Sequence, residues 1–121
     1  MTEYVPVFKP GQAITLAASA TITAGQVVMV SGVNTVAACT AASTGVVGVA
    51  AFDAVSTDKV TVYAGGVQSC TASGAITAGD PVIAGAAGTV VSSAAPPLGQ
   101  QVGLALNTAA DAAKVRVLFQ R

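Results

Sequence analysis

The chain has 121 residues, which fits one domain, and each half of it is too short to bury a stable core alone. Hydrophobic residues make up 53% of the sequence and charged residues only 8%, against about 25% in an ordinary soluble domain, so we expect an apolar surface that partners cover. The net charge is zero and the five basic residues are scattered, which excludes a basic footprint for DNA or RNA.

The first eleven residues are predicted to form an extended arm. Pro6 and Pro10 oppose a helix and favour extended backbone. Two interpretations stay open: an edge strand packed on the chain's own domain, or a segment whose Tyr4 and Phe8 dock on another subunit. The second gains weight because a terminus frays unless something holds it.

Neither a secretory signal nor a membrane span is expected. The chain begins with an acidic and proline-containing segment instead of a basic region followed by an apolar one. No apolar run in the sequence approaches the length that a membrane-spanning helix needs.

Residues 12–63 predict short strands separated by turns, which is typical of an all-β protein. Strands are expected at 14–16, 27–30 and 46–52, with a turn at Ala24-Gly25 and another at Ser31-Gly32 or Asn34. The run 46–52 is apolar around Gly48, which indicates a buried strand that another backbone approaches closely. Residues 53–58 form a polar connection to an alternating strand at 59–63.

The second half repeats the first. Residues 22–30 recur as residues 76–84, at an offset of 54, with the Ala-Gly pair kept in a tight turn that needs positive φ. With one extra residue after Val90, the match continues through residues 102–105 and 114–117. Two pseudo-repeats of about 55 residues are therefore predicted, at about 12–63 and 64–121, sharing one core in a single β domain at 12–121.

Within the second repeat, Gly65-Gly66 predicts a bend and residues 67–70 a strand. Residues 92–99 are the loop that tolerates the extra residue. Residues 108–113 are alanine-rich but correspond to the connection 53–58, so we expect a connection there.

No catalytic or metal-binding constellation is present in the sequence. It contains no histidine, which removes the commonest general base and metal ligand. The aspartates lie in connections and turns, where they favour local hydrogen bonds. The glycine-rich stretches lack the lysine and the following helix of a phosphate loop. We therefore expect that the protein is not an enzyme and that it binds no cofactor and no metal ion.

Cys39 and Cys70 are predicted to be reduced, buried and unbridged. A lone pair of cysteines is more often two small hydrophobic side chains than a disulfide. Neither has a histidine that would activate it as a nucleophile.

Four segments together resemble the capsid decoration (cement) proteins of tailed bacteriophages: YVPVFKPG (residues 4–11), ITAGQVV (22–28), VGVAAFD (47–53) and VTVYAGGV (60–67). The resemblance covers nearly the whole chain. It implies a small β-barrel or β-clip-like protein, made in the host cytoplasm, that binds the outer surface of an expanded head through the major capsid protein as a homotrimer. The scattered basic residues and the short apolar runs separately predict no nucleic-acid partner and no membrane.

The predicted capsid-binding segment is the arm, because extended backbone with large apolar side chains can add a strand to a neighbour's edge. Its residues are Thr2, Glu3, Tyr4, Val5, Pro6, Val7, Phe8, Lys9 and Pro10. The alternative function is a β-clip module that binds a small ligand or carbohydrate, but the sequence shows no candidates for the convergent polar pocket that it needs. A small hydrolase would require a carboxylate pair or an activated thiol, and nothing in the sequence calls for either.

Overall fold

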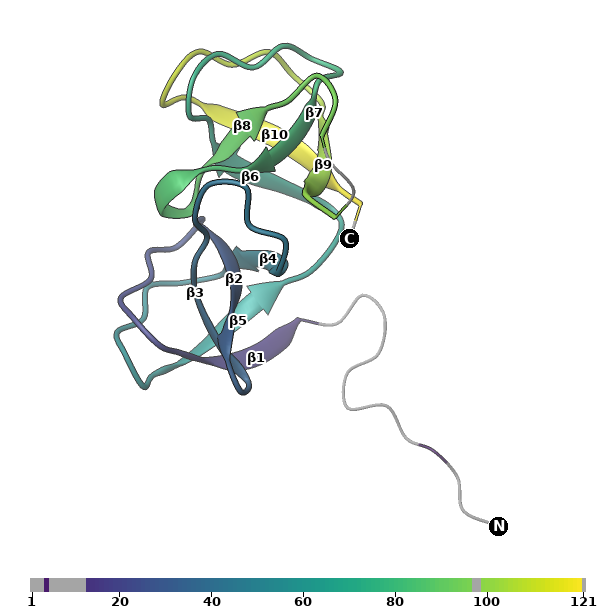
Figure 1. Cartoon of the computed structure of the whole chain (residues 1–121). Helices are drawn as coiled ribbons and strands as arrows, with labels where there is room; N and C mark the ends of the chain where they lie inside the picture. Colours follow the sequence, from purple (N-terminus) through teal and green to yellow (C-terminus); the bar gives the residue numbers. More distant parts are fainter. Residues whose placement is uncertain (1–3, 5–12, 97–98, 121) are drawn as a thin grey trace.

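Two β lobes, one from each half of the sequence, make up the folded part of the chain (Figure 1). The structure is a computed structural model that describes Tyr4, residues 13–96 and residues 99–120. In this part of the chain every named element is a strand except one 3-10 turn, η1 (Ala86–Gly88). The predicted all-β class is confirmed.

Lobe 1 is a closed five-stranded barrel with the strand order β1-β3-β2-β4-β5. β1 pairs antiparallel with β5 and parallel with β3, and the parallel pairing of Ala17 with Thr35 and Ala18 with Val36 closes the ring. The strands are β1 (Ile14–Ala18), β2 (Val27–Gly32), β3 (Thr35–Ala38), β4 (Val46–Ala50) and β5 (Lys59–Tyr63).

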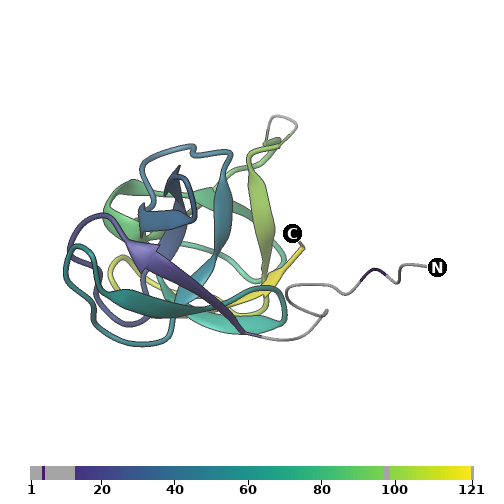
Figure 2. The ribbon, with the colours of Figure 1, turned by 90° about the horizontal axis from the view of Figure 1, so that it is seen from below.

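Lobe 2 follows the same plan, with the order β6-β10-β9-β7-β8. A single parallel bridge between Ala72 and Val90, at the positions equivalent to Ala18 and Val36, joins its two outer strands. The strands are β6 (Val67–Thr71), β7 (Pro81–Ala84), β8 (Val90–Ser92), β9 (Gln101–Ala105) and β10 (Lys114–Phe119). The lobes overlap when viewed from below (Figure 2), so they are stacked end to end.

Alternation of buried and more exposed residues is clearest in β10 of lobe 2 and β5 of lobe 1. Along β10 the side chains of Val115, Val117 and Phe119 are buried, while the residues between them are exposed. Val60 and Val62 are buried in the same way on β5. Each buried valine contributes roughly 1.5–3 kcal/mol relative to an exposed one, and side chains of this size suit narrow barrels.

The repeated Ala-Gly turn occurs in both lobes as predicted. Gly25 and Gly79 have φ of 86° and 90°, a region that costs a residue with a Cβ atom about 1 kcal/mol or more. The amide of Gly25 donates to the Ala50 carbonyl at 2.9 Å, and that of Gly79 donates to Ala105 at 2.8 Å. The turn therefore ties the start of β2 to the end of β4 in lobe 1, and the start of β7 to the end of β9 in lobe 2.

The predicted close backbone approach at Gly48 is also confirmed, and Gly103 repeats it. A Cβ atom at Gly48 would collide with the Tyr63 carbonyl, and one at Gly103 with the Leu118 carbonyl. Both glycines therefore allow a neighbouring strand to cross at van der Waals distance.

The expected single core is wrong: the buried residues form two clusters. The smaller lies wholly inside lobe 1 and includes Ile22, Val36 and Val60. The larger fills lobe 2 and extends into lobe 1 through Val27, Cys39, Val46 and Val49. The closed ring of strands in lobe 1 separates its interior from the larger cluster. The lobe 1 members that join the larger cluster therefore hold the stack together.

Several element boundaries differ from the predicted ones. β4 ends at Ala50, because residues 51–52 bend, instead of continuing to residue 52. β2 continues to Gly32, and the turn lies at Asn34, whose φ is 54°. Residues 108–113 form a connection, as predicted. Residues 97–98 of the predicted loop at 92–99 lie outside the described part of the chain.

Candidate functional surface

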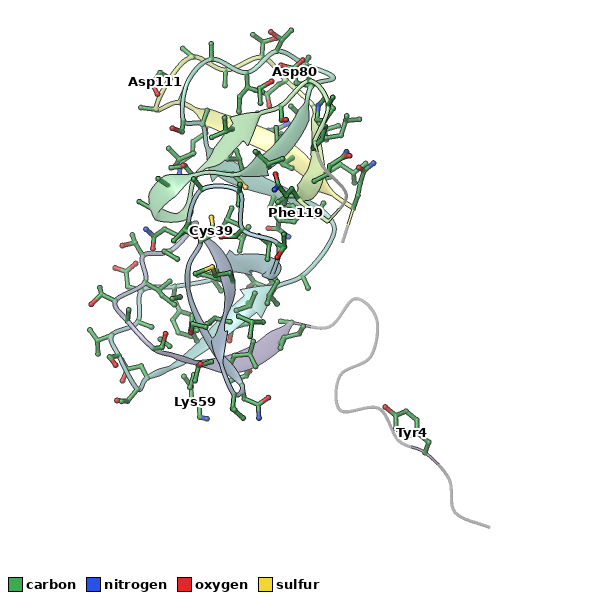
Figure 3. The ribbon with its side chains drawn as sticks, in the orientation of Figure 1. Tyr4, Cys39, Lys59, Asp80, Asp111 and Phe119 are labelled. Carbon is green, nitrogen blue, oxygen red and sulfur yellow. The ribbon has the colours of Figure 1, made fainter. Side chains whose placement is uncertain are left out.

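Tyr4 is the only residue of the predicted capsid-binding arm that the structure describes. Its side chain is 83% exposed and lies apart from both lobes (Figure 3), so it adds no buried contact to either barrel. The other arm residues lie outside the described part of the chain: Thr2, Glu3, Val5, Pro6, Val7, Phe8, Lys9 and Pro10.

Large apolar side chains are exposed on both lobes, as the composition predicts. Val33 is 91% exposed at the tip of the β2–β3 hairpin, and Val30 on the same hairpin is 54% exposed. The other large apolar side chains that are exposed in the described part of the two lobes are Phe52, Val55, Tyr63, Val67, Leu106 and Leu118. Exposed apolar surface of this kind marks contact sites for other proteins when its members lie together.

One such group lies on the outward face of β6 and β10. The strand register sets Val67 opposite Leu118 and Ser69 opposite Arg116. A groove of about 500 Å³ runs over this face and is lined by Val67, Ser69, Leu106, Asn107, Lys114 and Arg116. It combines apolar walls with two cations, and no acidic residue lines it.

A smaller hollow of about 290 Å³ lies where the lobes meet. Lys114 donates from Nζ to the Thr71 hydroxyl at 3.0 Å, and Gln26 donates from Nε2 to the Ala87 carbonyl at 3.1 Å. The lining also includes Thr23, Gly88 and Thr89. Sequence reasoning missed this hollow because its walls come from positions that are up to 91 residues apart, from Thr23 to Lys114.

The aspartates of the two lobes serve the turns, as predicted. Asp53 and Asp111 accept the amides of Ala24 and Gly74 respectively, each at 2.8 Å. Asp58 accepts the amide of Val55 at 3.3 Å. Carboxylates committed to backbone donors in this way are held as structural groups.

Asp80 also caps its own turn. Its Oδ2 accepts the Thr77 amide at 3.0 Å and the Ser92 hydroxyl at 2.8 Å. These two hydrogen bonds, that from Thr77 first, lower the pKa of Asp80 below its usual value because they stabilise the charged form. In lobe 1 the equivalent residue, Gln26, accepts the Thr23 amide through Oε1 at 2.8 Å.

Both cysteines are free and buried, which confirms the prediction of reduced thiols. Burial raises the pKa of Cys39 to about 11 and that of Cys70 to about 12. At neutral pH both are therefore neutral thiols with little nucleophilic character. Among the described residues no cluster of three or more histidine, cysteine or acidic side chains is arranged to hold a metal ion. In the same part of the chain no helix is long and apolar enough to cross a membrane.

The contact between the lobes is the feature that sequence reasoning missed. The β7–β8 hairpin of lobe 2 docks on lobe 1: the Gly88 amide donates to the Cys39 carbonyl at 3.1 Å, and the Ala42 amide donates to the Ala84 carbonyl at 2.9 Å. A signal was available, because the two repeats differ at all four hairpin positions, Ser-Gly-Val-Asn (31–34) against Gly-Ala-Ala-Gly (85–88).

The two-lobed fold and the sequence both have counterparts among known proteins. The solved N base of the head fiber gp8.5 of bacteriophage phi29 has a similar fold, with a TM-score of 0.71 at 20% identity over 90% of this chain and 93% of that one. At this identity the likeness concerns the fold alone. No curated protein matches the sequence. The sequence model of the phage cement proteins matches residues 8–120, nearly the full length, and the chain therefore belongs to the phage cement protein family.

Proposed function

We propose that this cement protein binds the outside of the phage head and stabilises the shell by bridging copies of the major capsid protein. Its family makes it a capsid-associated structural protein of the virion. The observation that supports the finer statement is the surface, where apolar side chains such as Val33 and Val67 are exposed and charged residues are few. Exposed apolar surface with few charges favours coverage by a partner.

In this proposal the arm supplies much of the attachment. Tyr4 is exposed and free to contact a partner. Residues 5, 7 and 9 have backbone amides that can donate, whereas Pro6 and Pro10 cannot. An extended segment of this kind adds to an exposed strand edge through one row of backbone hydrogen bonds. Its aromatic side chains provide the apolar area beside that row.

The test compares the full chain with a truncation that starts at Gly11, using co-sedimentation with undecorated heads. We expect the truncation to keep the β signal in circular dichroism and to lose most of its binding. A full-length variant with Tyr4→Ala and Phe8→Ala is the matched control, since it keeps the backbone of the arm. Full binding by the folded truncation would assign attachment to the lobes, and an unfolded truncation would make the arm an internal strand.

The bound state is proposed to be a homotrimer with more than about 1,000 Å² buried at each specific interface. Because the contacts are mainly apolar and backbone-mediated, binding to heads should weaken by less than about tenfold between low and moderate salt. The mass of the complex released from heads measures the first point, and co-sedimentation across a salt series measures the second. A single copy that touches no other copy on the shell contradicts the trimer.

The hollow between the lobes favours one alternative, a module that binds a small carbohydrate. Gln26, Thr71 and Lys114 present amide, hydroxyl and ammonium groups there. Titration with neutral oligosaccharides, followed by the amide NMR signals of these residues, distinguishes the two functions. Saturable shifts in a chain that ignores heads would favour the binding module.

A further inference from the structure

The two lobes use equivalent hairpins differently. In lobe 2 the hairpin at residues 85–89 is seated on lobe 1, and its Gly85 and Gly88 are buried. In lobe 1 the equivalent hairpin at residues 31–35 has Ser31 and Asn34 at those positions, and both are exposed. The side chain at its tip, Val33, is 91% exposed.

The surfaces that receive such a hairpin differ in the same way. On lobe 1 the seat of the lobe 2 hairpin, here called seat 1, consists of Ala24, Gln26, Cys39 and Ala42. Cys39 is 1% exposed there, and its thiol donates to the Gly85 carbonyl at 3.3 Å.

The corresponding surface on lobe 2, seat 2, is open. It comprises Ala78, Asp80 and Ser93, of which Ala78 is exposed and the other two are partly exposed. Ser93 matches Cys39 in the fold, because its amide donates to the Pro81 carbonyl at 2.9 Å as that of Cys39 donates to the Val27 carbonyl at 2.8 Å.

Within the described part of the chain, one hairpin and one seat are therefore left uncovered, at opposite ends of the stack. β1 lies between β3, which begins in the lobe 1 hairpin, and β5, which begins at Lys59. Lys59 lies at the end of the molecule away from Asp80 (Figure 3), so the lobe 1 hairpin lies at that end too. A contact between unlike surfaces on identical chains is heterologous, and it continues from copy to copy until a ring closes.

At each of the two contacts, the size of the hairpin residue complements the size of the seat residue. Gly88 is required on seat 1, because a Cβ atom there would lie 2.7 Å from Cβ of Gln26. The lobe 1 hairpin carries the larger Asn34 instead, and seat 2 carries Asp80, which is one methylene shorter than Gln26. Asp80 uses Oδ2 for its own turn, which leaves Oδ1 to accept from an asparagine amide.

We infer that the lobe 1 hairpin docks on seat 2 of a second copy of this chain, reproducing between molecules the contact that stacks the two lobes within one. Val33 then takes the place of Ala87 against Ala78, the residue equivalent to Ala24, and Asn34 faces Asp80. The contact buries the most exposed apolar side chain of the lobes without any further conformational change.

Disulfide coupling between full-length variants tests this contact. Val33→Cys is mixed with Ala78→Cys under a mild oxidant, in solution and on undecorated heads; the native thiols are buried and serve as an unreactive background. We expect the mixed dimer to form at least about tenfold faster than dimers from Val33→Cys mixed with Leu118→Cys, because docking raises the local concentration of the two thiols. Leu118 is exposed but lies on the outward face of β10, away from seat 2.

A second variant tests the polar pair. Asn34→Asp in the Val33→Cys chain sets two carboxylates against each other, and aspartate tolerates the positive φ of 54° at this position, so the fold is kept. Coupling to Ala78→Cys should then slow to the rate of the Leu118→Cys control. Equal rates for Ala78→Cys and Leu118→Cys without this substitution would overturn the inference. Coupling of Val33→Cys to the major capsid protein instead of to a second copy would overturn it as well.

Discussion

Lobe 1 and lobe 2 share a strand plan but differ where they touch each other. Both use an Ala-Gly turn with positive φ and a glycine at a strand crossing, at Gly48 and Gly103. Their hairpins diverge, and only the lobe 2 hairpin has the buried glycines that allow it to lie on the other lobe. The shared residues therefore serve strand packing within each lobe, and the differing residues serve the stacking of one lobe on the other.

The largest effect is expected from the shared strand crossing. Gly48→Ala and Gly103→Ala each place a methyl group against a neighbouring carbonyl that belongs to a barrel strand and cannot move freely. Each substitution should lower the free energy of unfolding by roughly 3 kcal/mol or more, measured by urea denaturation. Similar losses in the two variants are expected if the lobes are equivalent in this respect.

Gly45→Ala is the control for these two variants. A Cβ atom at this exposed position meets nothing within 4 Å, so stability should change by less than about 0.5 kcal/mol. A small loss for Gly48→Ala beside a large one for Gly103→Ala would show that only lobe 2 depends on the close crossing.

The contact between the lobes should show the next largest effect. Gly88→Ala introduces strain at a φ of 78° and also a clash with the side chain of Gln26, for a combined loss of about 2 kcal/mol. Gly65→Ala, at a φ of 72° with nothing within 4 Å, isolates the strain and should cost about 1 kcal/mol.

A double variant identifies the clash itself. Gln26→Ala removes two of the three atoms that the added methyl group of Gly88→Ala would meet, so it should recover part of the loss in that background. Strictly additive losses in the double-mutant cycle would mean that the hairpin moves away from Gln26 instead of pressing on it.

How far the sequence predicts this molecule depends on the range of the contacts. The turn at Gly25 and its copy at Gly79, the alternation along β5 and β10, and the close approach at Gly48 all follow from patterns within a few residues. The stacking of the lobes does not, because it joins Gln26 and Cys39 to residues some 60 and 50 positions away in the chain. A glycine-rich hairpin at residues 85–88 is therefore read as a turn, although it is also a docking surface.

The candidate site divides in the same way. The low share of charged residues and the absence of histidine from the sequence predict a structural surface from composition alone. The groove beside Arg116 and the hollow beside Lys114 need the strand register, which sets side chains of β6 and β10 opposite each other. The arm stays a prediction from sequence, since of its residues the structure describes Tyr4 only.

The two cysteines offer a smaller contrast between the lobes. The Cys39 thiol has a carbonyl acceptor on Gly85 at 3.3 Å, whereas the contact of the Cys70 thiol to the Gln68 carbonyl is 4.0 Å long. A serine hydroxyl at position 39 can use its acceptor, so Cys39→Ser should cost less than about 1 kcal/mol. At position 70 the shorter hydroxyl lies buried without a good partner, and Cys70→Ser should cost roughly 1–3 kcal/mol.

Thermal unfolding of the two serine variants measures this difference, and the two alanine variants correct it for lost packing.

The raised pKa values of the two thiols predict a further effect at alkaline pH. Both thiols stay neutral when folded but ionise near pH 9 when unfolded, so stability falls as pH rises from 9 toward 11. The Cys39→Ala/Cys70→Ala variant should show a flatter decline, and an unchanged slope would mean that the thiols are not shielded.

The smallest effect concerns the matched turn residues Gln26 and Asp80. Both accept the amide three residues earlier, but only Asp80 is ionisable, and its lowered pKa means that the folded state favours the carboxylate. Its contribution to stability is present above the usual pKa of 3.8 and is lost as pH falls through the lower folded value. Asp80→Gln gives lobe 2 the residue of lobe 1 and should remove this pH dependence while keeping the turn. The thermal midpoint of the wild type should therefore fall slightly more than that of Asp80→Gln between pH 7 and pH 3, because the other carboxylates are common to both chains and cancel in the comparison. Parallel midpoints over the whole range would mean that the Thr77 and Ser92 hydrogen bonds are replaced by water without loss, and that the two turns are equivalent in stability as well as in shape.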